Sequence, residues 1–412
     1  MTLVARRRAR RRAAWALALA LAPLAARGEW WTVENSIETR FESNDNVYLT
    51  ARTSPHVNTL SVSDTFEAAR RTENSATRAT LAGTALRSIG GGGIERVDGR
   101  LGLTQTLSDP LNVFRASAVY AQDFNDSAQS ADVTLGRGRR RTTTVDASWS
   151  RNLTERLRAD TQLAFVRTGY GRGLVGGVDY DDASASAGID YRLSEIDSIN
   201  VRGGHSRYRT RNDERSSATD DISVGASRAL SDRGSIALSV GAYRTRFRSD
   251  RSGIACPLDA SFCDAGLVRP VPFSVVQQSA SQGLQFSASY RYRFDERTDL
   301  SFSAGRRQAP SGGGSVVTNS TLNASVERSF SETLRGTLSY AGSQSRFDAG
   351  GAGRYGQQVL ALVVARQLAP DASVVATYQR TRAELLGTGA SASSNSVSVS
   401  LKYEWPRFDA SR

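Results

Sequence analysis

The sequence predicts an all-β protein: a transmembrane antiparallel up-and-down β-barrel of about 18 strands, with 16 strands as the fallback. Three observations predict this fold: a recurring turn signal, a period-two alternation of apolar and polar residues, and an alternation of tight and long connections. The composition of 36 Gly, 14 Phe, 13 Tyr and 5 Trp suits many short strands. No internal stretch approaches the roughly 18 apolar residues of a membrane helix, which excludes helical membrane proteins.

Residues 1–28 have the build of a secretory signal peptide. They contain seven Arg and no acid, an apolar run at 13–22, and the small residues Ala26 and Gly28 before the expected cleavage point. We expect the mature barrel domain to occupy 29–412; an uncleaved anchor is the alternative, although the apolar run is short for a span. Those seven Arg supply most of the net charge of +12, so the remaining basic excess is too dispersed for a nucleic-acid-binding surface.

The turn signal is an apolar residue followed by small polar and acidic residues. Its seven instances begin at Leu107, Leu153, Leu193, Leu230, Phe294, Phe330 and Leu368. Each interval fits two strands, one tight turn and one longer connection. Seven flanked turns, a final strand at 397–405 and three N-terminal strands near 31–41, 59–68 and 76–87 give the predicted total of 18.

The stretches that flank the turns alternate with a period of two. Between Leu284 and Phe294 every second residue is apolar, with Gln, Ser and Arg between them, and 183–193 and 397–405 repeat the pattern. Each strand therefore has one apolar and one polar face. A soluble sandwich would turn the apolar face inward, whereas a membrane barrel turns it outward.

The connections separate these two architectures. Tight turns alternate with longer connections, as in membrane barrels that have short periplasmic turns and longer external loops, whereas a β-solenoid would lack this asymmetry. The longer connections are expected at 122–142, 169–181, 209–220, 248–278, 308–318 and 383–395.

The polar faces predict the lining of the barrel lumen. Charges there avoid the roughly 2–4 kcal/mol that each Arg or Lys costs in mid-membrane lipid. The candidate lumen-lining residues are Asp98, Arg100, Asp146, Arg158, Asp160, Asp190, Arg192, Arg291, Arg293, Glu327, Arg335, Lys402 and Glu404. Two alternatives remain: an aqueous channel constricted by the 248–278 connection, and an interior filled by its own Arg–acid pairs.

Motifs for other chemistry are sparse. Cys256 and Cys263 predict a disulfide in an exported chain, because further metal ligands are lacking nearby, and no cofactor is expected. His205 is interpreted as a strand-end residue near the outer rim, outside any catalytic triad. The pair at 220–221 lacks the spacing of a known calcium loop. A basic run at 137–141 in a predicted external loop is either solvated or in contact with phosphates of lipopolysaccharide or an anionic polysaccharide.

The first predicted strand begins at Trp31 and continues through Val33, Ile37, Thr39 and Phe41 to an Asp45-Asn46-Val47 loop. Together with the repeated acidic turns and the chain length, this start resembles the β-barrel porins associated with PEP-CTERM/exosortase and exopolysaccharide systems. The resemblance implies an outer-membrane location and a link to surface polysaccharide. It supplies no catalytic residue.

The functional expectation is a passive, porin-like channel in the outer membrane of a Gram-negative bacterium. A non-conducting scaffold barrel of a surface-polysaccharide system is the alternative, and a barrel enzyme is least favoured. The expected partners are outer-membrane lipid and lipopolysaccharide, the barrel-assembly machinery, and polysaccharide or small solutes, with no nucleic acid.

Overall fold

The structure is a computed structural model that describes residues 30–50, 56–89, 94–125, 138–171, 177–212, 214–256, 269, 271–311, 315–347, 354–386 and 390–411. Within these ranges the regular structure is entirely β-strand. The described residues contain no α-helix with the length and hydrophobicity of a membrane span.

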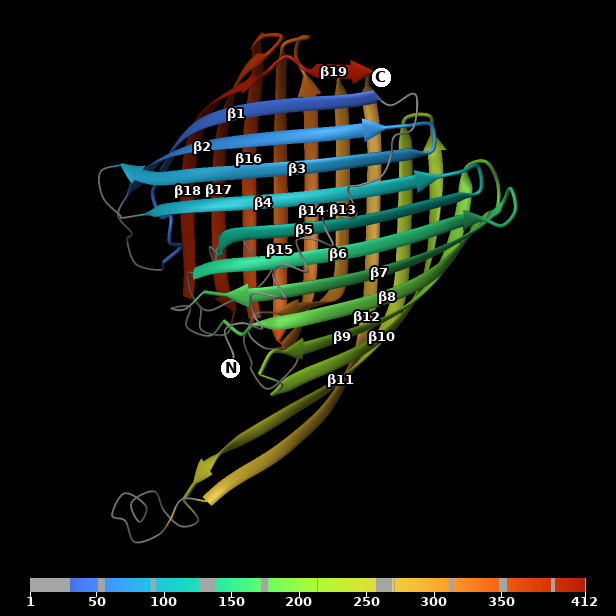
Figure 1. Ribbon diagram of the computed structural model, residues 1–412, viewed down its shortest axis with the longest axis vertical. Helices are drawn as coiled ribbons and strands as arrows, with labels where there is room; N and C mark the ends of the chain where they lie inside the picture. Colours follow the sequence, from blue (N-terminus) through green and yellow to red (C-terminus); the bar gives the residue numbers. More distant parts are fainter. Residues whose placement is uncertain are drawn as a thin grey trace.

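The strands follow one another along the chain (Figure 1). They are β1 (Trp30–Asn44), β2 (Val57–Arg71), β3 (Ser75–Ile89), β4 (Glu95–Ser108), β5 (Asn112–Asn125), β6 (Gly138–Asn152), β7 (Leu157–Tyr170), β8 (Tyr180–Arg192), β9 (Asp197–Thr210), β10 (Arg215–Ser231), β11 (Gly234–Ala255), β12 (Val271–Asp295), β13 (Thr298–Ser311), β14 (Ser315–Ser329), β15 (Leu334–Phe347), β16 (Arg354–Ala369), β17 (Ala372–Leu386), β18 (Ala390–Glu404) and β19 (Phe408–Ser411).

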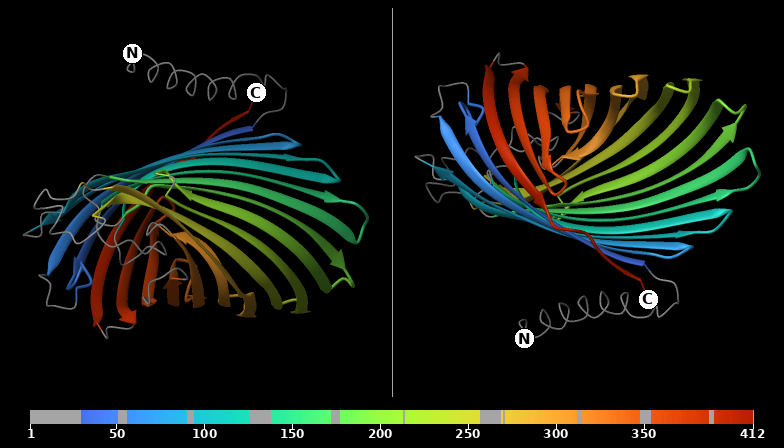
Figure 2. Two further views of the ribbon diagram at one scale, coloured as in Figure 1. Left: turned by 90° about the horizontal axis from the view of Figure 1, so that it is seen from below. Right: turned by 90° about the horizontal axis from the view of Figure 1, so that it is seen from above.

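These strands form a closed barrel. Each strand from β1 to β17 pairs antiparallel with the next, and β18 returns to pair with β1 from Ser36↔Glu404 to Asn44↔Ser396. The predicted 18-strand barrel is therefore confirmed, including its three N-terminal strands. The short β19 is additional and pairs with the start of β1, where Val33 lies opposite Phe408. Figure 2 shows the curved wall closing on itself.

The barrel has a turn end and a loop end. The turn end carries the tight connections 72–74, 109–111, 153–156, 193–196, 232–233, 296–297, 330–333 and 370–371. The loop end carries connections that include 45–56, 126–137 and 256–270. This is the asymmetry that the sequence predicts.

The polar residues of the repeated turn signal close the tight turns. Asp109 Oδ1 accepts the backbone N–H groups of Leu111 and Asn112 at 2.9 and 2.8 Å. These bonds hold the pKa of the Asp109 carboxyl below its usual range, because backbone N–H groups favour the charged form. The hydroxyls of Thr154, Ser194 and Ser331 accept N–H groups in the same way.

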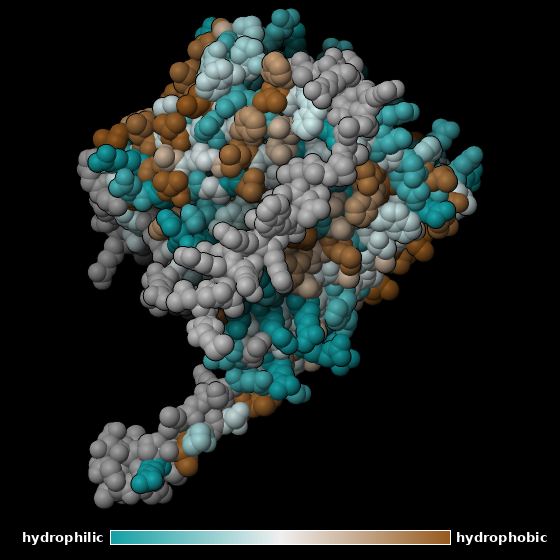
Figure 3. Space-filling view, in the orientation of Figure 1, coloured by the Kyte–Doolittle hydropathy of each residue, from teal (hydrophilic) through white to brown (hydrophobic). Residues whose placement is uncertain are grey.

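The two faces of the wall differ in chemistry. Large apolar side chains on the outer face are exposed, such as Leu81 (56%), Val97 (60%), Leu163 (58%) and Leu284 (67%). The buried side chains of the described residues are mostly hydroxyl or amide groups, together with Tyr208 and a few others. Figure 3 shows apolar patches spread over the barrel wall. Relative to a soluble protein, the polarity is inverted.

Two expectations about connections are wrong. Residues 248–255 and 271–278, predicted as parts of a constricting loop, instead extend β11 and β12 into a ribbon that projects from the barrel (Figure 1). Pairing from Arg248↔Gln278 to Ala255↔Val271 satisfies the backbone hydrogen-bonding groups within the ribbon itself. The part of the basic run at 139–141 lies in β6 rather than in a loop, because it pairs with 122–124 of β5; Arg137 lies outside the described residues.

Candidate functional site: the barrel lumen

The candidate lumen-lining residues lie on the inner face of their strands, opposite the exposed apolar residues. For example, Arg291 and Arg293 alternate with Tyr290, Tyr292 and Phe294 on β12. The same alternation places the remaining members on inner faces: Asp98 and Arg100 on β4, Asp146 on β6, Arg158 and Asp160 on β7, Asp190 and Arg192 on β8, Glu327 on β14, Arg335 on β15, and Lys402 and Glu404 on β18. That these residues line a solute path remains a proposal.

The structure joins some of these residues to each other and some to partners that were not anticipated. Glu327 pairs with Arg335 at 3.2 Å, and Lys402 pairs with Glu404. The unanticipated partners are Arg96 for Asp98 (3.3 Å), Arg202 for Asp160 (2.7 Å), Asp299 for Arg293 (3.3 Å), and the Ser117 hydroxyl for Asp146. The lumen therefore carries paired charges of both signs.

Gly188 allows the Asp160–Arg202 ion pair to form across three strands. Gly188 of β8 lies in register between Asp160 of β7 and Arg202 of β9. A Cβ at Gly188 would lie 2.9 Å from Asp160 Oδ1 and 3.1 Å from Arg202 Nε. Glycine is therefore what lets these two side chains meet over the middle strand.

The loop end of β13 separates from β12, and the end of the β13–β14 hairpin enters the mouth of the barrel while β14 stays paired with β15 up to Val317↔Phe347. The β12–β13 register ends at Phe286↔Arg306, although both strands continue beyond it. Phe302 and Leu322 are exposed on the outer face of β13 and β14. Because side chains alternate between faces, Gln308 and Thr318 would lie on that same outer face. They nevertheless contact residues on the inner face of β10 and β11. The end of this hairpin thus lies inside the wall formed by β9–β11.

Hydrogen bonds hold the hairpin end there, and we call this contact the clasp. The Tyr208 hydroxyl donates to the Ser311 carbonyl at 3.1 Å, and Tyr243 and Thr318 share a hydroxyl hydrogen bond of 3.2 Å. Gln308 Oε1 accepts the hydroxyls of Thr219, at 3.3 Å, and Thr245. Tyr208 is 1% exposed and Tyr243 is 6% exposed. The clasp is a buried contact that closes the β9–β11 side of the mouth.

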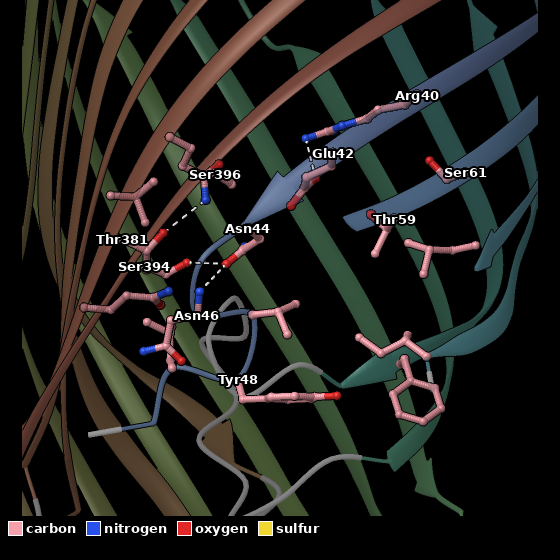
Figure 4. Close-up of a pocket in the computed structure, with 18 of the residues that line it drawn as sticks. Arg40, Glu42, Asn44, Asn46, Tyr48, Thr59, Ser61, Thr381, Ser394 and Ser396 are labelled. Atoms are coloured by element: carbon pink, nitrogen blue, oxygen red, sulfur yellow. Dashed lines mark hydrogen bonds and ion pairs between the residues drawn. The ribbon is translucent and has the colours of Figure 1, made fainter. Parts of the chain in front are cut away.

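A chamber of about 860 Å³ remains on the opposite side of the mouth (Figure 4). Its wall is formed by β1–β4 and by the inner face of β14–β18. Half of its lining residues are Ser, Thr, Asn or Gln, such as Ser61, Asn323, Gln357, Thr381 and Ser396. The charged groups include Glu38 and an Arg40–Glu42 pair of 2.9 Å. The chamber can therefore form many hydrogen bonds with an uncharged polar solute.

The loop after β1 lies in this chamber and is fastened to β18. Asp45 accepts the backbone N–H and the side-chain amide of Asn395, both at 2.7 Å. Asn46 Nδ2 donates to the Ser393 carbonyl at 2.9 Å. Figure 4 shows the Ser394 hydroxyl donating to Asn44 Oδ1, at 2.8 Å. The Asp45-Asn46 pair of the sequence motif thus bonds across the β1–β18 closure of the barrel.

A second cavity of about 890 Å³ lies at the turn end of the lumen. Its charged lining includes Glu34, Glu67, Arg71, Arg78 and Arg115. Arg78 pairs with Glu67 at 3.0 Å. Polar cavities therefore occur at both ends of the lumen.

The other chemical motifs do not form sites. Asp220 and Asp221 point to opposite faces, because they are consecutive residues of β10: Asp220 bonds to His205 outside, and Asp221 accepts Gln285 Nε2 inside. They therefore cannot share a calcium ion. His205 lies within β9, and Ala185, its neighbour in β8, offers no nucleophile. No group of three or more metal-ligating side chains occurs among the described residues.

One of the two cysteines of the predicted disulfide lies within the described residues. Cys256 directly follows β11 and is disulfide-bonded. Its expected partner, Cys263, lies outside the described residues, as does the expected signal peptide at 1–28. The pairing of Cys256 with Cys263 and the signal peptide at 1–28 therefore remain predictions.

Sequence reasoning missed two features of the lumen. The charged row on β1, with Glu38, Arg40 and Glu42, was detectable, because it alternates with Ile37, Thr39 and Phe41. The clasp had no such signal, since Gln308 and Tyr208 lie on strands that are not neighbours in the wall.

Comparisons with known proteins give structural likeness only. Neither a protein-family model nor a curated protein matches the chain. The crystal structure of OccAB2 of Acinetobacter baumannii aligns with this chain with a TM-score of 0.48 and 13% sequence identity, and the alignment covers 92% of this chain and 98% of that one. The outer membrane protein opdK of Pseudomonas aeruginosa has a TM-score of 0.48 and 9% identity, over 92% and 99%. The Ferric-Catecholate import receptor Fiu of E. coli K12 has a TM-score of 0.47 and 10% identity, over 93% and 82%.

Proposed function

We propose that this protein is an outer-membrane channel through which small polar solutes diffuse passively. The observation that carries this proposal is the inverted polarity of a closed barrel. Exposed Leu, Val, Ile and Phe residues cover the outer face, and ion pairs, hydroxyls and amides line the inner face. An apolar surface of this extent is typical of contact with lipid, and a polar lumen is typical of a water-filled interior.

The open path proposed here runs along the β1–β4 side of the lumen. The clasp occupies the β9–β11 side of the mouth, whereas the chamber at the loop end and the cavity at the turn end both contact β1–β4. Paired charges of both signs predict weak selection by charge. The hydroxyl and amide lining favours uncharged hydroxylated solutes.

The chamber also supports a link to carbohydrate. Sugar hydroxyls both donate and accept hydrogen bonds, as do the Ser, Thr, Asn and Gln side chains of the chamber. We therefore propose, as the finer form of this function, a role beside a surface- or exopolysaccharide system. In the same proposal, the barrel-assembly machinery inserts the chain through its C-terminal strand, and lipopolysaccharide surrounds the loop end.

A solute-uptake assay tests the proposed channel. Vesicles loaded with an impermeant polymer should swell in an isotonic monosaccharide solution when they contain the folded protein, and the rate should fall as the sugar becomes longer. Vesicles with heat-unfolded protein are the control. Inserted protein that does not raise the swelling rate above that of the control vesicles would contradict the channel.

A non-conducting scaffold barrel is the second candidate. The clasp favours it, because buried hydrogen bonds across the mouth rigidify the loop end. Insertion without solute flux would select this alternative.

A further inference from the structure

Five arginines form a group on the outer face of the barrel at its loop end. We call this group the arginine grid: Arg207 and Arg209 of β9, and Arg244, Arg246 and Arg248 of β11. All five are exposed. They alternate with buried residues of the inner face, such as Tyr208 and Tyr243, so the arginines point away from the lumen. The candidate solute path does not use them.

The grid lies next to the apolar band, on its loop-end side. On β10, the outer-face residues from Leu230 to Ile222 are mostly apolar, and Ile222 and Val224 are 58% and 53% exposed. Residues 222–230 match the roughly 9–11 residues with which a tilted strand crosses the hydrocarbon core. Toward the loop end, the outer face of β10 continues with Asp220, Ala218 and Ser216, and no large apolar residue follows there. The grid is therefore at the height of the lipid headgroups, and Figure 3 shows hydrophilic atoms gathered near the base of the ribbon.

The register of β9–β11 places small residues between the arginines. Ala218 of β10 lies between Arg207 and Arg246. One step nearer the loop end, Ser216 lies between Arg209 and Arg248. Neighbouring strands are about 4.8 Å apart, so long side chains on the outer two strands can converge over the small residue between them. The result is two successive sites where guanidinium groups flank an open position.

The acids near the grid orient the arginines without neutralising them. Asp220 Oδ2 binds Arg246 Nη2 at 2.8 Å, and Asp250 binds Arg248 Nε at 3.0 Å. Among the described residues, Arg207 and Arg244 form no ion pair or side-chain hydrogen bond. Asp181 of β8, which also binds Arg167, lies in register with Arg209, so among the described residues the five guanidinium groups lie near three carboxylates. Because each guanidinium has five N–H donors, several donors remain directed at the solvent.

We propose that the arginine grid binds the phosphate groups of anionic lipid in the membrane leaflet at the loop end. This inference rests on the proposed function, because it requires that the apolar band is embedded in a membrane. Guanidinium groups bind phosphate oxygens in bidentate pairs, which favours phosphate over a diffuse negative charge. The exposed residues directly below, Ile222 and Val240, would contact the acyl chains of the same molecule. This continuity of arginine and apolar surface selects a phosphorylated lipid over a free anion.

Lipid titration of the folded full-length protein tests this site. The protein in neutral detergent is titrated with diphosphorylated lipid A, and bound lipid is counted by native mass spectrometry. The grid variant combines Arg207→Gln with Arg246→Gln. The matched control combines Arg380→Gln with Arg382→Gln, which removes the same charge from the outer face of β17. We expect the grid variant to bind lipid A about tenfold more weakly, since charge-assisted hydrogen bonds are lost, and the control to bind like the wild type.

Three results would overturn the proposal. Equal affinity in the wild type and the grid variant would show that the grid does not hold the lipid. Equal affinity for lipid A stripped of its phosphates would remove the phosphate from the interaction. Displacement of lipid A by millimolar inorganic phosphate would show a general anion site instead. Vesicle flotation of the same preparations reports membrane insertion separately, so failure of the grid is distinguishable from failure of the proposed channel.

Discussion

Removing two hydroxyls from the clasp should widen the mouth of the barrel. Tyr208→Phe combined with Tyr243→Phe deletes the bonds to Ser311 and Thr318 and keeps both aromatic rings. Each buried neutral hydrogen bond stabilises the closed arrangement by about 1 kcal/mol, which gives about 2 kcal/mol for the pair. At about 1.4 kcal/mol per tenfold change, the ratio of open to closed mouth should rise about 30-fold.

Planar-bilayer recording measures this ratio as the time spent at high conductance. The control is Tyr290→Phe with Tyr292→Phe, which removes two hydroxyls from the outer face of β12. Both variants should keep the heat-sensitive gel migration of a folded barrel. A clasp variant whose conductance levels and dwell times equal those of the wild type and the control would refute the assignment of the hairpin end as the constriction.

Three further predictions concern the lumen, the β1–β18 closure and the ribbon. Replacing Arg291 and Arg293 with Glu should shift ion selectivity toward cations, most strongly at low salt where screening is weak; unchanged reversal potentials in a conducting protein would contradict their position on the lumen face. Asp45→Ala removes two short bonds to β18 at an exposed site, so it should destabilise the fold by about 1 kcal/mol and lower the urea midpoint; an unaltered midpoint would contradict a fastening role. Cys256 and Cys263 should appear linked in mass spectra of the non-reduced protein, and two free thiols would contradict the pairing.

Much of the fold was predictable because barrel strands repeat one local rule. The alternation from Leu284 to Phe294 defines two faces whatever the neighbouring strand is, so strand number and face assignment follow from local sequence. The turn signals have a local cause as well, since Asp109 caps its own turn through Leu111 and Asn112. Strand lengths were less predictable, because strands continue past the apolar band wherever a neighbour pairs with them.

The clasp could not be predicted, because it depends on where a strand leaves its neighbour. Gln308 has the outer-face parity of Phe302, yet it bonds to Thr219 and Thr245 inside the barrel. The cause is the end of β12–β13 pairing at Arg306, after which β13 is no longer held in the wall. Alternation specifies a face only while the strand stays in the sheet. The ribbon is a second example, since β11 and β12 beyond Arg248 pair only with each other, outside the loop end of the barrel.

Ion conductance of the folded protein in a planar bilayer of neutral lipid tests the central claim most directly. The account predicts stepwise current increments that scale with salt concentration, with weak selection between anions and cations because Asp160–Arg202 and Glu327–Arg335 balance the charge of the lumen. Protein shown by flotation to be inserted, but that carries no current steps at any salt concentration, would contradict a channel.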